Sequence, residues 1–69
     1  MEMEKVEAIQ ARLRILALGG SDQAVIRYGA VAGLEKDWAM NKSKRRWDDL
    51  MFAVRAAEAW MIFNGHASA

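Results

Sequence analysis

Hydrophobic residues recur every three or four positions over most of the chain, a period typical of amphipathic helices. In the N-terminal part, Val6, Ile9, Leu13 and Leu16 are spaced by three, four and three residues. This spacing predicts a helix over residues 2–18. A helix with one apolar stripe is stabilised mainly by packing that stripe against another element. The pattern therefore indicates a helix with neighbours.

The strongest break in the pattern is Gly19–Gly20, followed by Ser21. Glycine often ends a helix by adopting the left-handed conformation, and serine caps the start of the next helix. We therefore expect a second helix over residues 22–40. Gly29 and Gly33 would share one face of it. Each glycine inside a helix costs about 1 kcal/mol relative to alanine, so we expect a neighbouring backbone to approach this face closely. The alternative is two short helices broken at Gly33.

A third helix is predicted over residues 44–63, with Ser43 as its cap. After Asp49, the only charged residues in this helix are Arg55 and Glu58. A helix that is apolar on almost every side must be covered by other structure. We expect it to be the most central of the three helices. Asn64–Gly65 is a stop signal, and residues 64–69 are expected to form a frayed tail.

These elements predict an all-α, compact three-helix bundle that forms one domain over residues 1–69. A chain this short buries only about 60% of its unfolded surface, and small domains usually need disulfides, a metal or oligomerisation for stability. The sequence has no cysteine and a single histidine, His66, in the tail. Since 54% of the residues are hydrophobic, oligomerisation is the favoured source of extra stability.

The chain has more large apolar residues than a three-helix core needs. Scattered exposed hydrophobic residues are common, but each leucine-sized side chain left in water forgoes about 1.5–3 kcal/mol, and a small domain has only about 5 kcal/mol of stability. A contiguous contact patch is therefore favoured. The residues left over are Ile15, Leu18, Ile26, Met40, Met51, Phe52, Ile62 and Phe63. The predicted interface with a partner or a second copy comprises Met51, Phe52, Arg55, Glu58, Ile62 and Phe63.

A basic run precedes and opens the third helix, with four cations in five residues: Lys42, Lys44, Arg45 and Arg46. It can be a solvated linker, an electrostatic rim for an acidic protein, or a contact for phosphates, with Trp38 and Trp47 stacking on bases. If the segment is interpreted as a helix-turn-helix, its recognition helix would lie over residues 35–46. The net charge argues against nucleic-acid binding, because a charge of only +1 provides no global field that attracts phosphates.

No pattern indicates catalysis. His66 lies in the tail without a positioned nucleophile, and Asp48 and Asp49 diverge by about 100° on a helix. We therefore expect no enzyme activity, cofactor, metal or small-molecule substrate. The acidic N-terminus MEMEKVEA is unlike a signal peptide, and the longest apolar runs are too short to span a bilayer. These features predict a cytoplasmic protein that does not bind a membrane.

The predicted function is a non-enzymatic protein–protein interaction module: a small regulator, inhibitor or assembly factor. It would dock an apolar patch with a basic rim on a protein partner or on itself, as a homodimer or larger oligomer. The chain gives the general impression of a small phage or mobile-element protein, although no motif carries that impression. The alternative function is a small helix-turn-helix-like DNA-binding regulator that uses residues 35–46.

Overall fold

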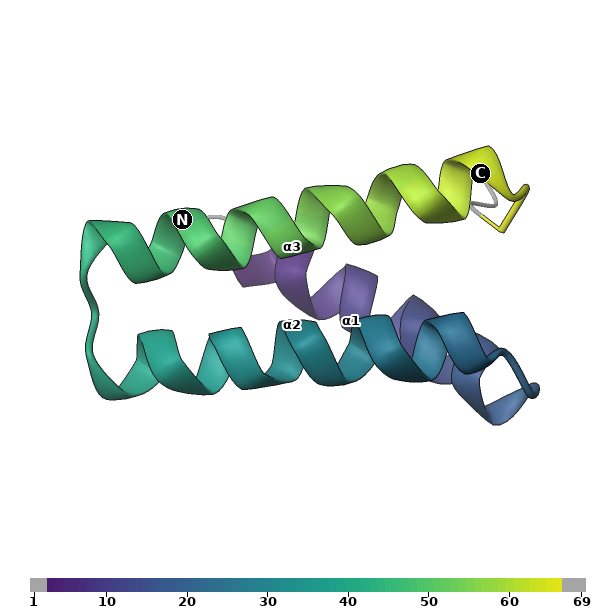
Figure 1. The fold of residues 1–69 in the computed structure, drawn as a ribbon, viewed down its shortest axis with the longest axis horizontal. Coiled ribbons are helices and arrows are strands. Elements are labelled where there is room, and N and C mark those ends of the chain that lie inside the picture. Colours follow the sequence, from purple (N-terminus) through teal and green to yellow (C-terminus); the bar gives the residue numbers. More distant parts are fainter. Residues whose placement is uncertain (1–2, 67–69) are drawn as a thin grey trace.

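Three helices make up the described part of the chain: α1 (Met3–Leu18), α2 (Asp22–Met40) and α3 (Lys44–Phe63) (Figure 1). They are seen in a computed structural model that describes residues 3–66. The predicted all-α, three-helix architecture is confirmed, and the predicted helix ends agree to within one residue. The predictions for residues 2 and 67–69, at the start of the first helix and in the tail, concern residues outside the described part of the chain.

The helices α2 and α3 run side by side in opposite directions, and α1 crosses behind them at an angle (Figure 1). α2 packs extensively against both of the other helices, whereas α1 and α3 share only a small contact. α2 is therefore the helix that packs on both of the others. The expectation that the third helix is the most central does not hold for these helix–helix contacts, but it does hold for buried side chains, because α3 contributes five of the ten buried hydrophobic residues among those described.

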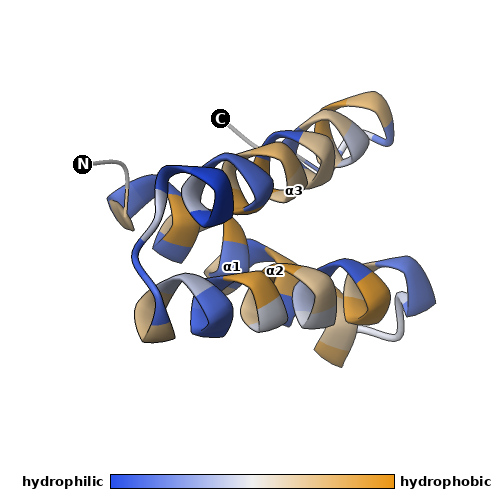
Figure 2. Ribbon diagram, turned by 60° about the vertical axis from the view of Figure 1, so that its left-hand side comes forward, coloured by the Kyte–Doolittle hydropathy of each residue, from blue (hydrophilic) through white to orange (hydrophobic). Residues whose placement is uncertain are grey.

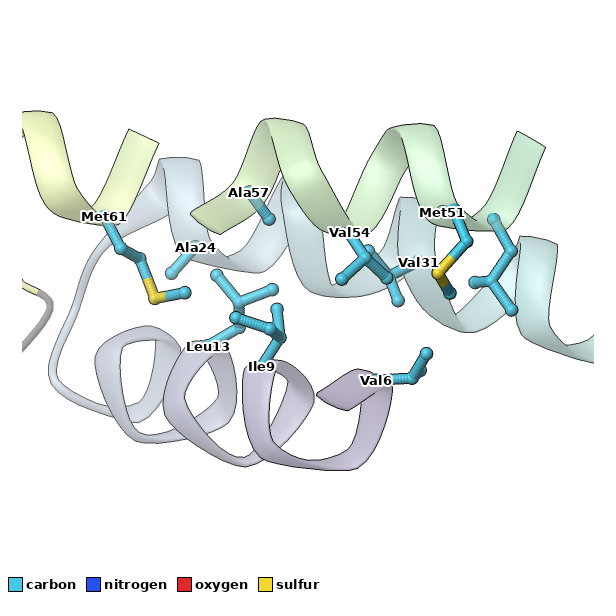
Figure 3. Close-up of a cluster of buried hydrophobic side chains, with 10 residues drawn as sticks. Val6, Ile9, Leu13, Ala24, Val31, Met51, Val54, Ala57 and Met61 are labelled. Atoms are coloured by element: carbon cyan, nitrogen blue, oxygen red, sulfur yellow. The ribbon is translucent and has the colours of Figure 1, made fainter. Parts of the chain in front are cut away.

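The core is a layer of side chains between α1 and the α2–α3 pair (Figure 3). It is apolar throughout, with no buried polar or charged residue among those described. Met51 belongs to this core and is only 6% exposed, so its assignment to the residues left over was wrong. The ten buried residues are Val6, Ile9 and Leu13 from α1, Ala24 and Val31 from α2, and Leu50, Met51, Val54, Ala57 and Met61 from α3.

The boundary between α1 and α2 forms as the sequence predicts. Gly20 has a φ of 101°; its N–H donates to the carbonyl of Ala17 at 3.0 Å, and the Ser21 N–H donates to the carbonyl of Leu16 at 3.1 Å. This pair of hydrogen bonds is the Schellman motif, which requires a left-handed residue and so favours glycine. The Ser21 hydroxyl then accepts from the Ala24 N–H at 3.2 Å and caps α2.

A serine cap and a glycine in the left-handed conformation also mark the two ends of α3. The Ser43 hydroxyl accepts from the Arg46 N–H at 3.2 Å. At the other end, Gly65 has a φ of 73°, and the His66 N–H donates to the carbonyl of Met61 at 2.7 Å. Residues 64–66 therefore form the cap of α3, and fraying of the tail stays a prediction.

Removing the side-chain cap of α3 tests how much this cap contributes to the stability of the protein. We expect Ser43→Ala to lower the free energy of unfolding by about 1 kcal/mol, because the Arg46 N–H loses its only side-chain acceptor. Ser43→Asp keeps an acceptor and is the control, with little or no loss expected. Urea unfolding followed by circular dichroism measures both, and an equal loss in the two variants would contradict the capping role.

The helix α2 is continuous through Gly33, so the alternative of two short helices is not formed. Gly29 and Gly33 are both exposed, and a Cβ atom added at either would meet nothing within 4 Å. The expectation that a neighbouring backbone approaches these glycines is therefore wrong for contacts within the described chain. They face outward because the core-facing side of α2 is the one that carries Ala24 and Val31.

Candidate interaction surface

The side of α3 that faces away from the core carries a regular apolar row. It comprises Phe52, Ala56, Ala59 and Phe63, which are all exposed and are spaced by four, three and four residues. This spacing keeps the four side chains on one face of a helix. Phe52 is 77% exposed and Phe63 is 91% exposed. We call these four residues the outer row of α3.

The structure separates the six residues predicted for the interface into two groups. Phe52 and Phe63 lie in the outer row, and Arg55 and Ile62 are exposed along one flank of it. Met51 and Glu58 instead lie on the part of α3 that turns toward the bundle. Met51 is buried in the core, and a Glu58 Oε1 atom lies 3.1 Å from Lys5 Nζ.

The Lys5–Glu58 ion pair joins α1 to α3 inside one chain. Its two side chains are 38% and 37% exposed, so the pair is partly screened by water and is of modest strength. Arg55 and Glu58 are three apart on one helix, a spacing at which opposite charges can pair. The packing of α1 brings Lys5 to Glu58 and leaves Arg55 without an ion pair among the described residues.

A depression of about 570 Å³ lies along the N-terminal half of this face. All of its described lining residues belong to α3, so it is a shallow hollow along one helix and no second element closes over it. Small-molecule sites are usually concave and bury most of their ligand. The shape of this depression suits the side chain of a docked protein better. Its lining residues are Trp47, Asp48, Met51, Phe52, Arg55 and Ala56.

The basic run 42–46 lies at the start of α3, in the hydrophilic stretch seen at the left of Figure 2. Lys44 Nζ contacts Asp48 Oδ2 at 2.8 Å. This hydrogen bond, together with the charge of the carboxylate, raises the pKa of Lys44. Lys42 Nζ lies 5.3 Å from the centre of the Trp38 ring. Arg45 and Arg46 are exposed, and neither forms an ion pair within residues 3–66.

Trp38 and Trp47 pack against each other, with ring centres 5.0 Å apart and planes tilted by 54°. Both rings are half-buried against the core. One face of Trp38 also lies under Lys42. Stacking on a base requires an open aromatic face, so this arrangement offers a poorer stacking platform than the sequence suggested.

Residues 35–46 do not form one helix. They comprise the C-terminal part of α2, the link 41–43 and the first turn of α3. The recognition helix of the helix-turn-helix alternative is therefore absent, because Ser43 starts a new helix and Asn41 ends the previous one in an extended conformation. Nucleic-acid binding itself stays a prediction.

A second aromatic cluster was not foreseen. The guanidinium carbon of Arg27 lies 5.1 Å from the centre of the Trp60 ring, and the His66 ring lies 5.3 Å from it. From the sequence, His66 was expected to lie in a frayed tail. No local signal could reveal this cluster, since Arg27 and Trp60 meet only through the packing of α2 on α3.

The outward faces of the other two helices also carry apolar residues. On α1 they are Ala8, Ala11, Ile15 and Leu18, and on α2 they include Ile26 and Met40; all are exposed. The large residues among them were expected to be left over from the core, and they are. Neither helix exposes a phenylalanine or tryptophan on that face, whereas α3 exposes two phenylalanines.

Within residues 3–66, no three histidine or carboxylate side chains are grouped to hold a metal ion. In the same range, none of the helices has the length and hydropathy needed to cross a membrane. No protein-family model, curated protein or solved structure matches the chain.

Proposed function

We propose that the protein is a non-enzymatic protein–protein interaction module that docks through the outer row of α3. The observation that carries the proposal is the exposure of Phe52, Ile62 and Phe63 on one side of a single helix, at 77%, 63% and 91%. Burying each side chain in a partner would contribute about 1.5–3 kcal/mol. In a small domain, an apolar row of this extent is typical of a contact site.

The exposed cations at the start of α3 provide the rim of this surface. Arg45 lies on the same side of the helix as the outer row, two turns before Phe52, and Arg46 lies beside it. Cations at the edge of an interface mainly orient the partner and speed association, while the apolar centre supplies affinity. A stoichiometric regulator, inhibitor or assembly factor in the cytoplasm would use such a surface.

Photo-crosslinking at single aromatic positions tests this function. Benzoylphenylalanine placed at Phe52 or at Phe63 is expected to give covalent adducts with a protein, because both side chains would be covered in the complex. Tyr28, on α2 and 37% exposed, is the control position and is expected to give few adducts. The experiment is done in cells that express the full chain, and mass spectrometry identifies the adducts. Equal labelling at all three positions, or no protein adduct at Phe52 and Phe63, would refute the proposal.

A DNA-binding regulator is the alternative function, and it is favoured by the exposure of Arg45 and Arg46, which form no ion pair within residues 3–66. Contacts to phosphates weaken steeply with salt because counterions are released, whereas apolar docking persists. If Lys44→Glu combined with Arg45→Glu abolishes the biological activity of the protein and Ile62→Asp does not, the DNA alternative replaces the proposed function. If Ile62→Asp abolishes that activity and the double charge reversal does not, the DNA alternative is eliminated.

A further inference from the structure

We propose that the outer row of α3 is covered by the same row of a second copy of the chain, with the two helices antiparallel about a two-fold axis. This inference rests on the proposed function and names the occupant of its surface. A two-fold interface must be self-complementary, because each residue meets on the partner the residue that meets it in return. The outer row of α3 has this property.

The row reads the same from either end. Its order is phenylalanine, alanine, alanine, phenylalanine, and its spacing of four, three and four residues is also symmetric. An antiparallel pair centred between Ala57 and Glu58 places Phe52 of one copy beside Phe63 of the other. The same register places Ala56 beside Ala59. Both matches occur twice, as two-fold symmetry requires.

The small residues lie where the two helices would be closest. Ala56 and Ala59 flank the proposed axis, so the helix axes can approach to about 8 Å, the close end of the range for packed helices. The phenylalanines on either side would then pair at both ends of the contact. Aromatic pairs contribute about 0.5–1.5 kcal/mol beyond their buried area.

The charges on α3 favour the antiparallel direction over the parallel one. A parallel pair would bring the two copies of Lys44, Arg45 and Arg46 together at one end, where their like charges repel. The antiparallel pair places these two groups at opposite ends.

Arg55 adds an attraction between the two copies in the antiparallel arrangement. Helical side chains lean toward the N-terminus of their own helix, so in the antiparallel pair Arg55 leans toward the last turn of the second copy's α3. That turn contains no basic residue of its own. A cation beside a helix C-terminus is favourable, and the aliphatic part of Arg55 would cover Ile62 of the second copy.

The area available fits a dimer of moderate strength. The four phenylalanines of the pair can each bury about 150–250 Å², or about 600–1,000 Å² together. With Ile62 and Arg55 added, the contact reaches the lower end of specific interfaces, about 1,200 Å². We therefore expect a dissociation constant in the micromolar range.

Sedimentation equilibrium of the purified full chain tests whether the dimer uses this row. Wild type is expected to dimerise with increasing concentration. Ala59→Glu is expected to raise the dissociation constant at least about tenfold, because it buries an unpaired carboxylate near the axis. Ala11→Glu is the matched control: it makes the same change at an exposed position on the outward face of α1 and should leave the dimer intact. Circular dichroism checks that both variants remain folded.

A spin label tests the direction of the pairing. The chain has no native cysteine, so Arg45→Cys carries a single label at the rim, outside the apolar centre of the proposed contact. Electron–electron double resonance should give a distance of about 40 Å between the two labels of an antiparallel dimer, and about 10 Å for a parallel one. A distance near 10 Å would overturn the inference, as would loss of the dimer in Ala11→Glu but not in Ala59→Glu.

A monomer at millimolar concentration would also overturn the inference, and crosslinking then decides the fate of the proposed function. Adducts of Phe52 and Phe63 with a different protein would leave that function standing without the dimer. Absence of any protein adduct would remove both proposals.

Discussion

Leu13→Ala is expected to lower the free energy of unfolding by about 2–5 kcal/mol. Leu13 is fully buried at the centre of the layer between α1 and the other two helices (Figure 3). The loss combines the transfer free energy of the missing atoms with the cavity that they leave. Since a domain of this size has about 5 kcal/mol of stability, a loss at the upper end would leave much of the protein unfolded at 25 °C.

Leu18→Ala is the matched control for this prediction. It removes the same atoms from the same helix, but Leu18 is 79% exposed. Substitutions at such positions usually change stability by less than about 0.5 kcal/mol. Urea unfolding at low micromolar concentration, followed by circular dichroism, measures both variants. Similar losses in the two would show that α1 packs on the bundle through a different face.

The double substitution Gly29→Ala with Gly33→Ala is expected to raise the free energy of unfolding by about 1–2 kcal/mol in total, since alanine is favoured over glycine by about 0.5–1 kcal/mol at each interior helix position. The surroundings permit the change, because a Cβ at either glycine meets nothing within 4 Å. Neither residue has a positive φ. Thermal and urea unfolding of the double variant measure the gain.

Gly20→Ala is the control for the glycine prediction and should do the opposite. A Cβ there also meets nothing within 4 Å, but the φ of Gly20 is 101°, a conformation that alanine adopts only with strain. We expect a loss of stability from the same chemical change. A gain of stability at Gly20, or a loss in the double variant, would contradict the backbone conformations of these glycines.

Much of the secondary structure could be predicted because its signals are local. Gly20 and Ser21 end one helix and cap the next through bonds that reach no further than five residues, and Ser43 and Gly65 do the same for α3. Turn chemistry of this kind depends on few neighbours. These local stop and cap residues therefore located the helix ends to within one residue.

The candidate surface could be predicted only in part. The surplus of apolar residues indicated that some of α3 would be left uncovered, and Phe52, Ile62 and Phe63 are exposed. The spacing of a helix that is apolar almost all round does not show which side packs inward, however. For that reason Met51 was assigned to the surface although it lies in the core, and Glu58 was assigned to the interface although it pairs with Lys5.

The sequence by itself determined three helices, their ends and an excess of hydrophobic residues over what one small core can bury. Only the tertiary structure decided that α2 packs on both of the other helices, that Gly29 and Gly33 face outward, and that the symmetric row from Phe52 to Phe63 remains exposed. The reason is physical. Helix formation depends on hydrogen bonds between residues four apart, whereas the face that each helix buries depends on side chains far along the chain that meet only when the bundle packs.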